Sequence, residues 1–118
     1  MTFYSPLEPT IRFISDEAVQ NLPLSKDTLV RISDFYAMYH GVDATVMRKV
    51  VSCESGWNQY AIGDKGHSRG LVQIYDTYHP DISTQQAFNA FFSLNYLAEN
   101  ISKGKGHMWS CFRAVNAP

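Results

Sequence analysis

The feature that most constrains the fold of this chain is the abrupt loss of helical periodicity after Glu54. Before that point apolar residues recur at helical spacing, and Val46, Val50 and Glu54 fall at positions i, i+4 and i+8. These three side chains share one face of a helix, so the carboxylate is carried inward with the valines. The glycines that follow predict turns up to about residue 82: Gly56, Gly63, Gly66 and Gly70.

Two helices are expected before this break. Ser25 is a typical N-cap, the apolar residues after it recur at helical spacing, and Gly41 is a typical C-terminal stop. Asp43 can cap the second helix, which is the one that carries the valines.

The segment after the break predicts a short strand at Leu71–Tyr75 and a loop at residues 78–81. Ser83 then caps a long helix that reaches about Ile101, and a last helix spans about residues 108–114. One apolar stripe of the long helix is expected in the core: Ala87, Phe91, Leu94, Ala98 and Ile101.

Length and composition place these elements in one domain. The chain has 118 residues, of which 45% are hydrophobic and 18% charged, and its formal net charge is −1. Such a small charge disfavours nucleic-acid binding, and no apolar run approaches the roughly 20 residues of a membrane span. We expect a mainly α fold with a minimal β hairpin or strand over residues 25–118. An irregular lead-in at 1–24, with a short helix from Ser15 to Asn21, precedes it.

The start of the chain, Met1 to Pro6, has no basic region and no apolar stretch, so no signal peptide is predicted. The residues alone leave three explanations open. The sequence can be an excised domain, a protein exported by another route, or a cytoplasmic protein.

The two cysteines, Cys53 and Cys111, allow one pairing. A disulfide would join the helix of Glu54 to the C-terminal helix and close a loop of about 60 residues, contributing ~3–4 kcal/mol in the chain-entropy model. Two buried free thiols are the alternative, because unpaired cysteine is among the most buried residue types.

Glu54 is the candidate catalytic residue. A single carboxylic acid in a half-apolar cleft has a raised pKa and can act as a general acid on a sugar oxygen. The alternative is a helix-end carboxylate in water. The four histidines show no paired spacing typical of a metal site, so no metal is expected: His40, His67, His79 and His107. No cofactor is expected either.

Three motifs in order resemble the lysozyme-like superfamily, with the lytic transglycosylase catalytic domains (SLT type) and the goose-type lysozymes as its nearest members. The motifs are Glu54-Ser55, then Gly63-Asp64-x-Gly66, then Ser68-x-Gly70-Leu71-Val72-Gln73-Ile74. The resemblance covers about residues 43–115. It implies a lysozyme-like catalytic domain in which Glu54 protonates the β-1,4 bond between N-acetylmuramic acid and N-acetylglucosamine of peptidoglycan.

The same resemblance implies a substrate cleft near Ser55 and Gln73, an extracytoplasmic location and a monomer acting on peptidoglycan strands. Trp57 and Trp109 can line the cleft or pack in the core. Arg69 and Lys65 can meet the carboxylates of peptide stems or lie in an exposed loop.

One residue departs from the transglycosylase pattern. Val115 stands in Ala114-Val115-Asn116-Ala117, where these enzymes usually have a tyrosine. In these enzymes the tyrosine helps to place the acid or the sugar. Tyr96 or Tyr75 can fill that role here, or the domain is truncated, or its activity is weak.

Asp64 decides between two reactions. A transglycosylase needs no second carboxylate, whereas in the goose-type pattern Asp64 would position water as a second carboxylate for hydrolysis. The simpler interpretation of Asp64 is a turn residue that bonds to its own backbone. A third possibility is a module with this fold that binds glycan or a protein partner without catalysis.

Overall fold

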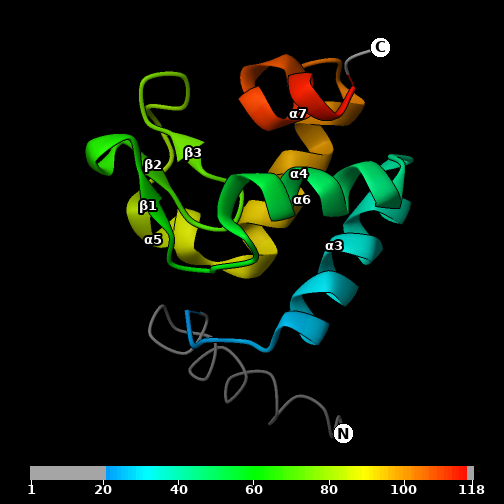
Figure 1. Cartoon of the computed structure of the whole chain (residues 1–118), viewed down its shortest axis with the longest axis horizontal. Helices are drawn as coiled ribbons and strands as arrows, with labels where there is room; N and C mark the ends of the chain where they lie inside the picture. The colour runs from blue at the N-terminus through cyan, green and yellow to red at the C-terminus, as the bar shows by residue number, and fades with distance from the viewer. Residues whose placement is uncertain (1–20, 117–118) are drawn as a thin grey trace, which may run out of the picture.

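The computed structural model describes residues 21–116, so the expected lead-in helix at Ser15–Asn21 lies outside the described residues except for Asn21. The described chain is mainly helical with one small sheet (Figure 1). Its elements in order are α3 (Lys26–His40), α4 (Ala44–Ser55), β1 (Ile62–Gly63), η1 (Asp64–Gly66), β2 (Ser68–Arg69), β3 (Ile74–Tyr75), α5 (Thr84–Phe88), α6 (Ala90–Ser102), η2 (Gly106–Met108) and α7 (Ser110–Val115). The mainly α prediction with a minimal β segment is confirmed.

The two helices before the glycine-rich region begin where capping chemistry predicts. The Ser25 hydroxyl accepts the Thr28 amide at the start of α3, and an Asp43 carboxylate oxygen accepts the Thr45 amide at the start of α4. Gly41 closes α3 in the left-handed conformation, with φ 71°. Local sequence therefore sets both helix starts, and α3 then packs against α4 and α6.

The sheet is antiparallel with the order β1-β2-β3. The strand expected over Leu71–Tyr75 is shorter than predicted, because only Ile74 and Tyr75 pair with β2. Gln73 has a φ of 51°, which is left-handed and interrupts an extended strand. Leu71 and Val72 are fully buried in the preceding turn, so their apolar character reflects burial rather than strand pairing.

The long helix expected from Ser83 to Ile101 is two helices, α5 and α6, with the break at Asn89. Asn89 has extended backbone angles, and its side chain accepts the Phe92 amide as the N-cap of α6. The placement of Phe91 in the core is wrong, because its side chain is 49% exposed. The buried face of α6 consists of Ala90, Ser93, Leu94, Leu97, Ala98 and Asn100.

The C-terminal region also differs from the prediction. The helix expected at 108–114 begins later, at Ser110, and a short 3-10 turn at Gly106–Met108 precedes it. This last helix, α7, packs against α4. Figure 1 shows the sheet on the side toward which the C-terminal end of α4 points. The end of α4 thus faces both the sheet and the start of α7.

The core lies between these elements. It joins the inward side chains of α4 and α6 to the turn before β3 and to Trp109, which is only 2% exposed. In the described part of the chain, no helix is both long and apolar enough to cross a membrane.

Gly70 offers a test of this packing. A Cβ at Gly70 would lie 2.0 Å from the Ala87 carbonyl oxygen, and the residue has a φ of +85°. We expect Gly70→Ala to lower the free energy of unfolding by about 3 kcal/mol or more. The backbone of Gly70 and the backbone of Ala87 are both held by packing, so neither can move easily to relieve the clash. Urea unfolding of the full chain measures this.

Gly104→Ala is the matched control. Gly104 has a similar φ of +76°, but a Cβ there would meet nothing within 4 Å. Only the cost of the left-handed conformation remains, about 1 kcal/mol. Equal losses in the two variants would contradict the close approach of Gly70 to α5.

Candidate functional site

Glu54 lies one residue before the end of α4, where Gly56 closes the helix with a φ of 61°. Its half-buried carboxylate lines a hollow of about 220 Å³ on the surface. The other lining residues come from the sheet region and from the segment that leads into α7: Asp64, Ser68, Gln73, Tyr75, Tyr78, Met108, Trp109, Ser110 and Arg113. The chain therefore gathers residues that are far apart in sequence around one carboxylate.

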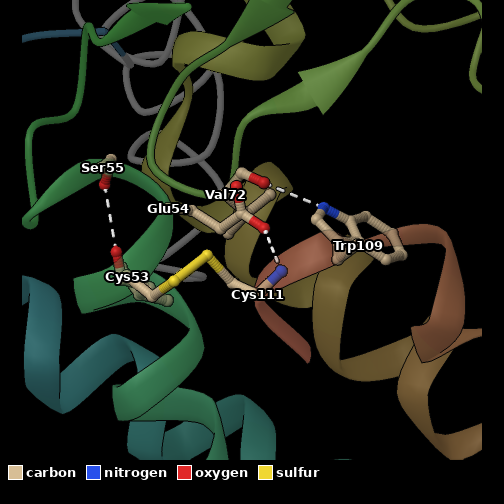
Figure 2. The surroundings of a disulfide bond; sticks show 7 residues. Cys53, Glu54, Ser55, Val72, Trp109 and Cys111 are labelled. Carbon is tan, nitrogen blue, oxygen red and sulfur yellow. Dashed lines mark hydrogen bonds between the residues drawn. A yellow bond between two sulfur atoms is a disulfide. The ribbon is translucent and has the colours of Figure 1, made fainter. Parts of the chain in front are cut away.

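A disulfide between Cys53 and Cys111 joins α4 to α7, with a Cα–Cα distance of 5.9 Å (Figure 2). The residue after Cys53 is Glu54, and the backbone amide of Cys111 donates a hydrogen bond of 3.1 Å to Glu54 Oε2. The covalent bond and the hydrogen bond thus hold the same two segments together. Together they restrict how far the Glu54 carboxylate can move.

Trp109 provides a second link. Its indole N–H donates to the Val72 carbonyl oxygen over 2.8 Å, as Figure 2 shows beside the disulfide. This bond ties the start of α7 to the buried turn before β3. Three segments that are bonded to one another therefore line the Glu54 pocket.

The surroundings of Glu54 raise its pKa above the ordinary value of a glutamate. The largest cause is burial, which penalises the charged form, and the nearby negative charge of Asp64 acts in the same direction. The Cys111 amide and the positive charge of Arg113 favour the charged form and oppose the rise. The net effect keeps the proton on Glu54 at a higher pH, as a general acid requires.

Asp64 is exposed and lines the same hollow as Glu54. It has a left-handed backbone with φ 50°, and its carboxylate accepts a hydrogen bond from the Ser68 hydroxyl. Its backbone oxygen accepts the His67 amide, which closes the turn. Asp64 is thus a turn residue by its bonding and a second carboxylate of the pocket by its position.

Gln73 lines the pocket and also holds its wall. Its side-chain amide donates to the carbonyl oxygens of Ala61 and Gly70, both at 3.0 Å. A Cβ at Gly63 would lie 2.5 Å from Gln73 Oε1, so the amide sits tightly against the glycine turn. Both amide hydrogens are therefore engaged by the backbone, and the side chain fixes the shape of the sheet beside Glu54.

The candidate residues divide between the pocket and its surroundings. Asp64, Gln73 and Tyr75 lie with Glu54 in the pocket, whereas Ser55, Trp57 and Tyr96 do not line it. Ser68, which begins the third sequence motif, also lines the pocket, and the pocket residues that the sequence did not single out are Tyr78, Met108, Ser110 and Arg113. Their sequence positions carry no motif, since they reach the pocket only through the folding of loops and α7.

The three predicted residues outside the pocket have structural contacts. The Ser55 hydroxyl donates to the Val51 carbonyl oxygen, and Trp57 packs partly buried against the core. The Tyr96 hydroxyl bonds to His79 Nδ1 at 2.8 Å. Val115, which stands where the resemblance predicts a tyrosine, is partly buried against the core.

Within residues 21–116 no three His, Cys, Asp or Glu side chains group in a way that could hold a metal ion. Comparison with protein-family models, with curated proteins and with solved structures finds no match to this chain. Inferences about its function consequently rest on its own residues.

A buried histidine supports the wall of the pocket. His79 is 4% exposed, bonds to the Tyr96 hydroxyl and packs against Trp109 with ring centroids 5.0 Å apart. Burial lowers the pKa of His79 below its ordinary value, and the positive charge of Arg69 adds to the effect. The neutral imidazole is therefore the form that the fold favours.

This predicts a loss of stability in mild acid. An unfolded chain protonates His79 at a pKa near 6.5, above the folded pKa, so the unfolded state binds more protons as the pH falls through this range. We expect the free energy of unfolding to fall from pH 7 to pH 5 more steeply in the wild type than in His79→Gln, which cannot titrate. Denaturant unfolding at several pH values measures both slopes, and equal slopes would contradict the prediction.

Proposed function

We propose that this protein cleaves the β-1,4 glycan backbone of peptidoglycan between N-acetylmuramic acid and N-acetylglucosamine, with Glu54 as the catalytic acid. The observation that carries the proposal is the half-buried Glu54, with its raised pKa, in an open pocket lined by aromatic and hydrogen-bonding side chains. Aromatic faces and hydroxyl or amide groups suit a sugar ring. Peptidoglycan lies outside the cell membrane, so the proposal includes an extracytoplasmic location, where a disulfide persists.

The proposed reaction is that of a lytic transglycosylase. Protonated Glu54 gives its proton to the glycosidic oxygen, and the bond to the N-acetylmuramic acid carbon C1 breaks. The N-acetyl oxygen of the same sugar attacks C1 and holds the positive charge. The Glu54 carboxylate then takes the proton of the 6-hydroxyl, whose oxygen attacks C1 and displaces the N-acetyl oxygen. The product is a 1,6-anhydro sugar, and the carboxyl group is protonated again.

The position of Asp64 favours a second candidate, a muramidase that hydrolyses the same bond. An inverting hydrolase uses a second carboxylate, about 6.5–9.5 Å from the acid, to activate water. Asp64 lines the pocket of Glu54 and raises its pKa by charge, so it lies within electrostatic reach. Its bond to Ser68 leaves the carboxylate in the turn, which is why the transglycosylase is preferred.

Glu54→Gln tests the catalytic assignment. Glutamine keeps an acceptor for the Cys111 amide but has no proton to give, so turnover should fall by about 10²–10⁴-fold while the fold is kept. The measurement is digestion of purified peptidoglycan, with mass spectrometry of the released fragments. Unchanged lysis by this variant would refute Glu54 as the acid.

Asp64→Asn is the matched variant, because it neutralises the other carboxylate that lines the pocket. A transglycosylase should keep most of its activity and release 1,6-anhydro ends, each lighter than a hydrated end by one water molecule. Free reducing ends, together with a loss of activity in Asp64→Asn as large as in Glu54→Gln, would favour the muramidase. Binding without cleavage by the wild type would favour a non-catalytic glycan-binding module.

A further inference from the structure

We propose that a second hollow beside the Glu54 pocket, with Arg113 at its edge, binds the carboxylate-bearing peptide stem of the glycan substrate. This inference rests on the proposed function. It names the part of the substrate that the protein recognises in addition to the sugars.

The two hollows adjoin. The second has a volume of about 460 Å³ and is lined by Tyr78, His107, Met108 and Arg113, three of which also line the Glu54 pocket. Only His107 is new. A sugar chain seated at Glu54 would therefore present its substituents directly to this second hollow.

Arg113 has free capacity to bind an anion. The side chain of Arg113 is exposed on α7, and within the described chain the one hydrogen bond of its guanidinium runs from Nη1 to the His107 carbonyl oxygen. No carboxylate of the described residues forms an ion pair with it. A guanidinium has five N–H donors in a planar fork, which matches the two oxygens of a carboxylate.

The other lining residues suit a short peptide. Tyr78 is 58% exposed, and its ring contacts Tyr75 edge to face at 5.1 Å, which gives the hollow a fixed aromatic wall. Met108 adds a flexible apolar surface for aliphatic side chains. His107 is exposed and can donate or accept a hydrogen bond with peptide groups. The stem is attached to N-acetylmuramic acid and carries free carboxylates, so its charge complements Arg113.

The two basic residues suggested by sequence for this role are placed differently. Arg69 is buried, and its guanidinium donates to the Thr84 hydroxyl and the Ile82 carbonyl oxygen. Lys65 is exposed in the left-handed turn of η1 and lines neither hollow. Arg113 is the basic side chain that lines both hollows.

The test compares two substrates. Intact peptidoglycan carries the stems, and glycan strands treated with an amidase have lost them. Arg113→Gln should lower kcat/KM on the stem-bearing substrate about tenfold more than on bare strands, the effect of one lost charge-assisted contact. Any change that acts through the charge felt by Glu54 is common to both substrates, so the ratio of the two kcat/KM values isolates the stem.

Two further variants sharpen the result. Arg113→Lys keeps the positive charge near Glu54 but loses the planar fork. It should keep the pH profile of the wild type and still lose activity selectively on stem-bearing substrate. Lys105→Gln removes one charge from an exposed residue that lines neither hollow, and it should leave the ratio unchanged.

Equal losses on both substrates in the Arg113 variants would overturn the inference while leaving Glu54 as the acid. The same shift of the ratio in Lys105→Gln would also overturn it, because general charge attraction would then explain the effect. A wild-type protein that cleaves neither substrate would instead contradict the proposed function and this inference with it.

Discussion

The hydrogen bond from the Cys111 amide to Glu54 is the interaction on which the proposed site depends. It joins the C-terminal end of α4 to the first turn of α7, and the Cys53–Cys111 disulfide links the same two helices covalently. An amide at the start of a helix has no intrahelical partner, so the carboxylate satisfies a donor that would otherwise need water. Without α7 in this place the carboxylate would be open to solvent, and the pocket would lose one wall.

Opposing influences act on this carboxylate. Burial and Asp64 favour the protonated form, whereas the Cys111 amide and Arg113 favour the ionised form. The balance raises the pKa, yet the carboxylate remains stabilised once it has given up its proton. A group that must act first as an acid and then as a base needs both states to be accessible. The charged form of Glu54 is therefore accessible although its pKa is raised, as the proposed role requires.

Local chemistry made part of the fold predictable from sequence. The caps Ser25 and Asp43 and the stop at Gly41 act within a few residues, and all three are where the pattern predicts. The break at Asn89 was missed because apolar spacing continues through it, although asparagine is a strong N-cap. The pattern does not predict that Gln73 interrupts the strand. Its left-handed backbone accompanies hydrogen bonds from its side chain to the Ala61 and Gly70 carbonyl oxygens, which only the folded chain brings into reach.

The residues of the candidate site also differ in how far they could be predicted from local sequence. Glu54, Asp64, Gln73 and Tyr75 lie close to one another in sequence and could be foreseen as neighbours. Arg113 could not be foreseen, because it reaches the pocket through α7. The position of α7 depends on its packing and disulfide with α4, which lies far away in the sequence. Tyr96 was expected beside the sugar, but its hydroxyl is bonded to His79 behind the Trp109 wall.

The most direct test of Glu54 as the acid is an NMR titration of its side-chain carboxyl, with Glu54→Gln used to assign the signal. We expect a pKa above the ordinary glutamate value, because burial and Asp64 outweigh the Cys111 amide and Arg113. A pKa at or below that of an exposed glutamate would contradict it. Glu54 would then be ionised at the near-neutral pH of the proposed reaction and could not serve as the acid.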